Sequence, residues 1–132
     1  MKVRQIPGAY SVARFDAASQ AAAALFGPEA PGAGRFLSVT RTGDELSVVC
    51  ESGLVPLLSA SREERGWSLM MVEGPLDFAL TGILSSISAP LAAADVSIFA
   101  VSTYDTDYVL VRERDLGAAA AALSGAGFEV VR

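Results

Sequence analysis

The stretch that decides the fold is IFAVSTYDTDYVLVRE, residues 98–113. Apolar and polar residues alternate on both sides of a polar centre, which predicts two strands, at residues 96–102 and 107–112. Residues 103–106 are rich in side chains that favour turns, so the two strands should pair as an antiparallel hairpin. The flanking sequence then decides what covers this hairpin.

Helical segments flank the hairpin on both sides. Before it, residues 78–94 place apolar side chains near helical spacing, and Asp77 is a suitable N-cap. After it, residues 116–124 are alanine-rich and are followed by Gly-Ala-Gly, a sequence typical of a helix end. Further strands are expected at residues 67–72, before the first helix, and at residues 128–131, after the second helix. This order, βαββαβ, predicts a ferredoxin-like α+β fold with an antiparallel sheet and both helices on one face.

The first half of the chain follows a shortened version of the same plan. Its two β-rich runs, residues 36–41 and 45–51, are joined by Thr-Gly-Asp, a good hairpin turn. An offset of 62 residues aligns FLSVTRTGDELSVVCE with the stretch quoted above. We therefore expect a tandem duplication, with a degenerate unit at residues 1–65 and a complete one at residues 66–132.

The remaining elements of the first half are short. Alternation predicts a strand at residues 10–15, and Asp16 can cap a helix over residues 17–26. One or two helical turns are expected at residues 54–60. The charged run at residues 61–66 is interpreted as a surface link.

The composition narrows the functional classes. The net charge of −5 comes without any basic run, so nucleic acid is not an expected partner. The chain contains no histidine, which removes His-based nucleophilic catalysis and the commonest zinc ligand. No cofactor motif is present, neither a P-loop nor GxGxxG nor CxxC. Because Cys50 is the single cysteine, the chain cannot form an internal disulfide, which fits a cytoplasmic setting. Its surroundings are more typical of a small apolar strand residue than of a reactive thiol.

No membrane segment is predicted. The first five residues lack the apolar core of a signal peptide, and the longest uncharged run, residues 78–94, is interrupted by serine, threonine and proline. Because 52% of the residues are hydrophobic, apolar surface is expected to be buried in an oligomer.

Two segments are candidates for a ligand site. Residues 73–82 join a strand to a helix, and free backbone N–H groups at a helix start attract anions. Asp77 there is a helix cap by default, and a contact with a ligand ammonium is compatible with capping. Residues 102–107 are rich in hydroxyl groups, which turn chemistry alone can explain, whereas Asp107 could bind a cationic or amino group. Asp105 and Asp107 together are only a weak metal signal.

The sequence VEGPLDFALTGILSSISAPLAAADVSIFAVSTYDTDYVLVRERDL, residues 72–116, resembles the ACT domain, in the branch of small bacterial proteins with two tandem ACT-like halves. It is also similar to the ACT units of aspartokinases and of the cytosolic arginine sensor. The resemblance covers residues 67–131. It implies that an amino acid or another small ligand binds at the interface between paired ACT units.

The resemblance also implies three groups of site residues. The turn before the first helix would hold the ligand's backbone groups, and the strand end would hold its side chain, with Asp107 facing a cationic group. A partner unit would contribute the start of the second helix. These positions are Asp77, Phe78, Ala79, Leu80, Thr81, Ser102, Thr103, Tyr104, Asp107, Gly117 and Ala118. Leu80 stands where the arginine sensor has a glutamate, so a smaller or less cationic ligand is equally compatible.

These observations together predict a non-catalytic, cytoplasmic, homodimeric regulatory protein that binds a small molecule, most simply an amino acid. One alternative is a structural dimerisation module whose pocket is vestigial. The other is an enzyme on the same fold, which fold alone does not exclude. The enzyme is the weaker alternative because the chain lacks histidine and any convergent pair of base and nucleophile.

Overall fold

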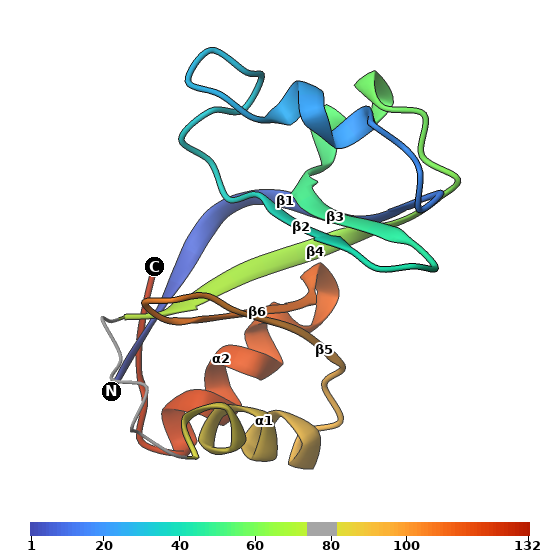
Figure 1. Cartoon of the computed structure of the whole chain (residues 1–132). Coiled ribbons are helices and arrows are strands. Elements are labelled where there is room, and N and C mark those ends of the chain that lie inside the picture. The colour runs from blue at the N-terminus through green and yellow to red at the C-terminus, as the bar shows by residue number, and fades with distance from the viewer. Residues whose placement is uncertain (74–81) are drawn as a thin grey trace. The chain divides into compact units, whose positions relative to one another are not determined.

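The computed structural model describes residues 1–73 and 82–132. The chain divides into two compact units, which we name the C-terminal unit (Met1–Gly8 with Trp67–Arg132) and the inserted unit (Ala9–Gly66). The elements are β1 (Lys2–Phe15), η1 (Ala21–Leu25), β2 (Ser38–Arg41), β3 (Leu46–Glu51), η2 (Ser52–Leu57), β4 (Arg62–Val72), α1 (Ile83–Ala93), β5 (Ile98–Ser102), β6 (Asp107–Arg112), η3 (Glu113–Asp115), α2 (Leu116–Gly125) and β7 (Glu129–Val131) (Figure 1).

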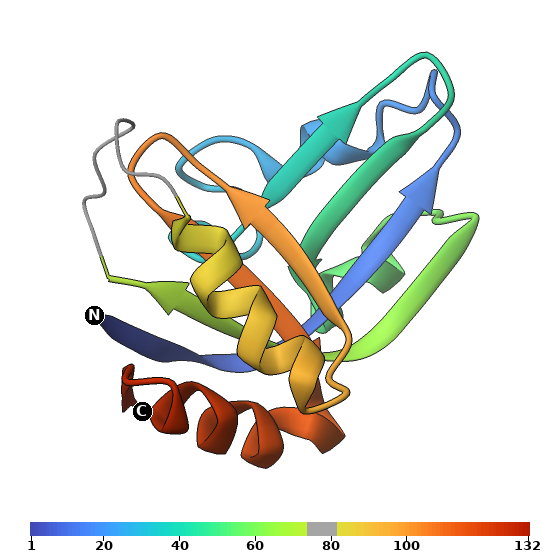
Figure 2. The same ribbon diagram turned by 90° about the horizontal axis from the view of Figure 1, so that it is seen from below.

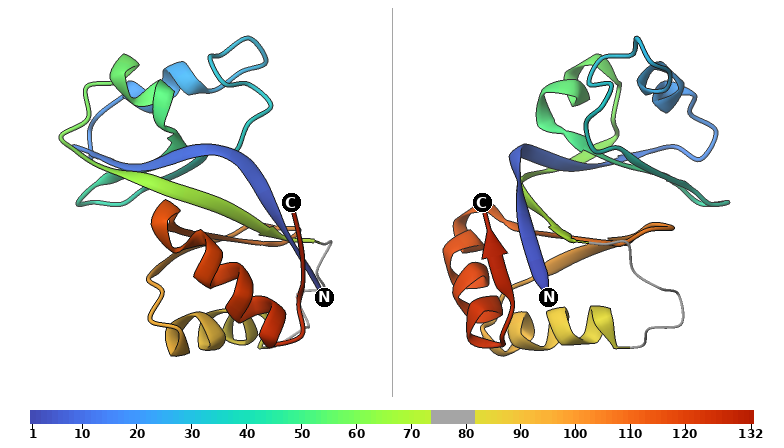
Figure 3. Two further views of the ribbon diagram at one scale, coloured as in Figure 1. Left: turned by 180° about the vertical axis from the view of Figure 1, so that it is seen from behind. Right: turned by 90° about the vertical axis from the view of Figure 1, so that its left-hand side faces the viewer.

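The C-terminal unit has the predicted ferredoxin-like order, β4-α1-β5-β6-α2-β7. Antiparallel pairing joins β6 to both β4 and β5, and α1 and α2 lie side by side on one face of these strands (Figures 2 and 3). One strand was not predicted here. The first residues of β1 lie between β7 and β4, and β1 pairs with β7 in parallel, with Val3 opposite Val130.

The core of the C-terminal unit lies between this sheet and the two helices. Val3, Met70 and Val111 enter it from the strands, and Leu91 and Leu123 enter it from the helices. The two leucines have no exposed surface, and burial of each contributes about 1.5–3 kcal/mol. The N-terminal residues of the chain are therefore an integral part of this unit, because Val3 completes its core.

The inserted unit repeats the same element order with shorter helical parts, as β1-η1-β2-β3-η2-β4. Its strands follow the order β2-β3-β1-β4, and η1 and η2 cover one face of them (Figure 1). The predicted helix over residues 17–26 is only the short 3₁₀-helix η1, because Ala22 and Leu25 alone are buried and too little apolar area supports a longer helix.

The prediction of a surface link at residues 61–66 was wrong. Residues 62–66 form the start of β4, and the backbone N–H and the hydroxyl of Ser61 both donate to the carbonyl oxygen of Arg14, at 2.9 and 2.8 Å. The charged side chains concealed the strand because most of them point to solvent. This strand is the fourth strand of the sheet in the inserted unit, after β2, β3 and β1. The two units thus share an element order, while their origin by tandem duplication stays a prediction.

The two hairpins have the same turn. Four-residue loops separate Arg41 from its strand partner Leu46, and Ser102 from its partner Asp107. The backbone N–H of the first loop residue donates to the carbonyl of the fourth in both, from Thr42 at 2.9 Å and from Thr103 at 2.8 Å. The structural offset is therefore 61 residues, so the sequence alignment at 62 was wrong by one position. A slip of one residue assigns each side chain to the opposite face of the sheet.

A glycine with positive φ marks the point where each long strand passes from one unit to the other. Gly8 in β1 has a φ of 117°, and Gly66 in β4 has a φ of 81°. Residues with a Cβ rarely adopt this conformation, so both positions require glycine for backbone reasons.

We expect Gly66→Ala to destabilise the protein by about 1–2 kcal/mol through backbone strain alone, because an added Cβ at Gly66 meets no other atom. Urea unfolding followed by circular dichroism measures the change. Gly53→Ala is the matched control, since its Cβ also enters open space but its φ is not positive. An unfolding midpoint that shifts equally in the two variants contradicts the assignment of strain to Gly66.

Candidate ligand-binding site

The first predicted wall of the site falls mostly outside the described residues. Asp77, Phe78, Ala79, Leu80 and Thr81 lie in residues 74–81, outside the described part of the chain. Glu73, the residue before this segment, is held by two contacts with β1. Glu73 accepts a hydrogen bond from Arg4 Nε at 2.6 Å, and its backbone N–H donates to the carbonyl of Lys2 at 3.0 Å. The charge pair of Arg4 and Glu73 thus attaches the end of β4 to β1, a contact that no sequence signal indicated.

The second predicted wall is brought together by the β5–β6 hairpin. Ser102 and Asp107 are the last strand pair before the loop, and Thr103 and Tyr104 follow Ser102 within it. Tyr104 is 81% exposed, whereas Asp107 is half-buried. Among the described residues, the Asp107 carboxylate has no hydrogen-bond or ion-pair partner. A half-buried carboxylate of this kind can accept charge-assisted hydrogen bonds from a ligand ammonium.

The hydroxyl of Thr103 is already used by the turn. It donates to the carbonyl oxygen of Thr106 at 3.0 Å and accepts from the backbone N–H of Thr106 at 3.2 Å. Thr103 therefore holds the shape of the loop, and its hydroxyl is engaged within the turn.

Thr106 is the residue that sequence reasoning missed. It is buried, and its hydroxyl donates a short hydrogen bond to the carbonyl oxygen of Val72, the last residue of β4. The hairpin loop is thereby attached to the strand end that leads into the first predicted wall. A threonine in a polar turn gives no signal of burial, which explains why only the structure revealed this contact.

Gly117 and Ala118 lie elsewhere in the unit. Both are exposed at the start of α2, which follows the end of β6 through η3. Asp107 begins β6, and a strand of six residues is about 20 Å long. Within one unit, Gly117 and Ala118 therefore lie far from Asp107. Their predicted contribution to the same site requires a second unit.

Outside residues 74–81, no group of three or more Cys, Asp or Glu side chains is placed to hold a metal ion. In the same part of the chain, no helix is long and apolar enough to cross a bilayer.

Cys50 is a core residue of the inserted unit. Its side chain has no exposed surface and packs in the cluster that contains Val48 and Leu58. Burial, with smaller contributions from the negative charges of Glu63 and Glu51, raises the pKa of the thiol to about 11. The interpretation of Cys50 as an apolar strand residue is confirmed.

Because the thiol stays protonated when folded, Cys50 should not react with Ellman's reagent in the native protein at pH 8, and should react with one equivalent in denaturant. Raising the pH from 9 towards 11 should also destabilise the fold, because the unfolded thiol ionises over this range while the folded thiol resists ionisation. Rapid stoichiometric labelling of the native protein contradicts this assignment.

Thr106→Val should destabilise the protein by about 1–3 kcal/mol, because it leaves the Val72 carbonyl without the buried donor while keeping the side-chain volume. Thr40→Val, at an exposed position of β2, is the matched control and should change stability by less than about 0.5 kcal/mol. Chemical denaturation of both variants provides the measurement. Equal free energies of unfolding for the two variants would show that the Thr106 hydrogen bond does not stabilise the fold.

Comparisons with known proteins agree with this architecture. A family model described as the ACT domain matches residues 62–125, and a second model, described as an N-terminal domain, matches residues 8–57. The crystal structure of protein Atu0741 from Agrobacterium tumefaciens is 38% identical, covers 98% of this chain and 91% of its own, and superposes with a TM-score of 0.85. The C-terminal unit is therefore a ferredoxin-like domain of the ACT type. The similarity to the ACT domain covers residues 62–125, most of which lie in the C-terminal unit.

More distant relatives carry informative names. The cytosolic arginine sensor for mTORC1 subunit 1 of Bos taurus is 37% identical over 91 residues, which is 62% of this chain and 28% of that protein. The matches span only 28–57% of the first curated relatives. The regulatory subunit of aspartate kinase from Thermus thermophilus shares the fold, with a TM-score of 0.66 at 11% identity over 96% of this chain and 97% of its own.

Proposed function

We propose that this protein is a non-catalytic regulatory protein that binds a free amino acid where two ACT units pair. The observation that carries the proposal is the Asp107 carboxylate, half-buried, unpartnered among the described residues and placed at a loop that Thr106 attaches to β4. Preorganised polar groups at a fixed strand end are typical of small-ligand sites. The name of the arginine-sensor relatives supports an amino acid as the ligand class.

The proposed site combines all three predicted groups. Ser102, Thr103, Tyr104 and Asp107 form one wall, and residues 77–81 are proposed for the adjacent one. The start of α2, with Gly117 and Ala118, would come from a second unit, because it lies at the far end of β6 from Asp107. The proposal therefore includes a homodimer in the cytoplasm, with no cofactor and no catalytic step.

A thermal-shift screen of the full chain against the twenty amino acids tests this function. A ligand at ten times its dissociation constant stabilises the folded state by about 1.4 kcal/mol, which raises the melting temperature by a few degrees. Asp107→Asn should reduce the rise in melting temperature more strongly for lysine or arginine than for alanine. The matched control is Asp105→Asn, a neighbouring exposed carboxylate of the same loop.

Three outcomes separate the proposal from its alternatives. No shift with any amino acid at millimolar concentration rejects amino-acid sensing, and a dimer in light scattering then favours the structural module. If Asp107→Asn weakens the binding of all amino acids equally, Asp107 does not recognise the side chain of the ligand. A monomer at micromolar concentration that still binds contradicts a site shared between two copies.

A further inference from the structure

One edge of the sheet in the C-terminal unit is open to another strand. β5 is the last strand of the sheet order, and among the described residues β6 alone pairs with it. An open strand edge offers its backbone N–H and C=O groups to any strand that reaches it, so proteins usually guard such edges with charged side chains, proline or short length. β5 has no such guard, because its sequence IFAVS contains no charge and no proline and has the usual strand length.

The other outer strands of the described sheet are guarded. β2 has four residues and ends at Arg41, whose guanidinium donates a hydrogen bond to the carbonyl oxygen of Ser19 at 2.7 Å. β7 has three residues and begins at the exposed Glu129. Both strands are therefore poor templates for further pairing, and β5 differs from them by its lack of protection.

The pairing with β6 decides which backbone groups of β5 are free. Hydrogen-bonded and non-hydrogen-bonded pairs alternate along an antiparallel ladder. The backbone N–H of Thr103 donates to the carbonyl oxygen of Thr106 at 2.8 Å, so the next pair, Ser102 with Asp107, is a non-hydrogen-bonded one. Every second residue of β5, counted back from Ser102, therefore turns its N–H and C=O groups away from β6. These residues are Ile98, Ala100 and Ser102.

The uncharged surface continues from this edge onto α1. Ser86 lines a small pocket together with residues 126–128, which follow α2, so the Ser86 side of α1 faces α2. Leu84 lies about 200° from Ser86 around the helix, which places it on the side of α1 turned away from α2. That side is nearer to β5, because α1 lies between α2 and β5 (Figure 2). Leu84 is 37% exposed, and α1 contains no charged residue.

The charge of the chain indicates what fits this surface, which we name the β5 strip (Ile98–Ser102 with Leu84). Each copy of the chain carries a net charge of −5, so two copies repel each other least where neither surface is charged. A strand can also pair with an identical strand about a two-fold axis, in the antiparallel direction. With Ala100 opposite the partner's Ala100, the free groups of Ile98 meet those of the partner's Ser102. The β5 strip is thus complementary to itself.

We propose that two copies of this chain pair through β5 in this antiparallel register, which joins their sheets into one. The inference rests on the homodimer of the proposed function and identifies its surface. Ser102 and Asp107 are a strand pair, and the register places the partner's Ile98 on the other side of Ser102. At about 4.8 Å per strand, the partner's Ile98 lies about 10 Å from Asp107 in the same row of side chains. The partner copy therefore adds an apolar side chain beside the Asp107 wall.

Light scattering after size exclusion of the full chain, over a range of micromolar concentrations, tests the pairing. Ala100→Glu should raise the dimer dissociation constant by at least about tenfold, because it places two like charges opposite each other at the two-fold axis. Ala121→Glu is the matched control. It adds the same charge at an exposed alanine of α2, and should change the dissociation constant by less than about twofold.

A second variant separates strand pairing from a simple charge effect. Ala100→Pro removes the outward N–H without adding a charge, and it leaves the hydrogen bonds between β5 and β6 in place. It should therefore weaken the dimer as Ala100→Glu does. Melting curves check that all the variants are folded.

Cysteine substitutions at the edge test the register. In the proposed dimer, the two copies of residue 100 are hydrogen-bonded neighbours with Cα atoms about 5.5 Å apart, within the reach of a disulfide. The two copies of residue 102 are four residue steps, or about 13 Å, apart and beyond that reach. Ala100→Cys should therefore form a disulfide-linked dimer on mild oxidation, whereas Ser102→Cys should not. Cys50 does not compete, because it is buried.

Each negative result has a distinct meaning. A wild-type dimer that neither Ala100→Glu nor Ala100→Pro weakens overturns the inference, while the homodimer of the proposed function stands. A wild-type monomer at micromolar concentration overturns it as well, and leaves the edge to a strand of another protein. A dimer through β5 that gives no thermal shift with any amino acid supports the inference and rejects amino-acid sensing instead.

Discussion

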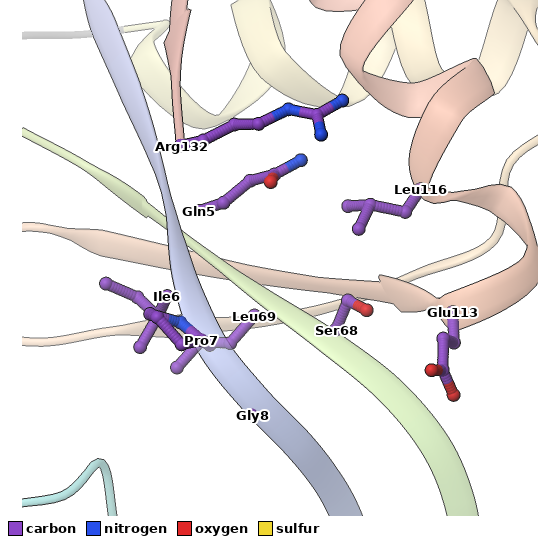
Figure 4. Close-up of a pocket in the computed structure, with 9 residues that line it drawn as sticks. All are labelled: Gln5, Ile6, Pro7, Gly8, Ser68, Leu69, Glu113, Leu116 and Arg132. Atoms are coloured by element: carbon purple, nitrogen blue, oxygen red, sulfur yellow. The ribbon is translucent and has the colours of Figure 1, made fainter.

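The pairing of β1 with different partners along its length is the constraint on which the rest of the structure depends. Residues 2–4 pair in parallel with β7, whereas residues 10–15 pair in antiparallel with β3. The first part of the strand supplies Val3 to the core of the C-terminal unit, Arg4 to the ion pair with Glu73 and Gln5 to the lining of a pocket (Figure 4). Because β7 joins the sheet by pairing with this strand, loss of β1 would detach β7 and remove one side of the core of the C-terminal unit.

The C-terminal unit has different chemistry at the two ends of β6. At its start, Asp107 follows a loop that is held by hydroxyl groups, and the loop is attached to the end of β4 through Thr106. At its end, Glu113 begins η3 and is among the residues that line the pocket of Figure 4, together with Leu116 and Arg132. Between these two ends, the row of β6 side chains in the core is apolar, because Val109 and Val111 are both buried. The two ends of β6 are therefore separated by a buried apolar row.

The sequence predicted the parts of this protein that depend on local patterns. The hairpin from Ile98 to Arg112 and the helix beginning at Leu116 were found with nearly correct bounds, because alternation and turn chemistry act over a few residues. The two errors have separate causes. The alignment offset was wrong by one because identity between the hairpins is low, while the register follows from backbone hydrogen bonds. The strand at residues 62–66 was missed because its exposed charges conceal it.

Sequence by itself determined the fold class and the family resemblance, since hydrophobic period and turn residues are visible along the chain. A carboxylate at a strand start is visible in the same way, and it led to the proposal of a ligand site at Asp107. Only the tertiary structure decided that Met1–Gly8 belongs with Trp67–Arg132, that Thr106 is buried against Val72, and that Gln5, Ser68, Glu113 and Arg132 line one pocket. The physical reason is the same in each case. These contacts join residues far apart in the chain, and pairing between distant strands leaves no periodic signal in either partner.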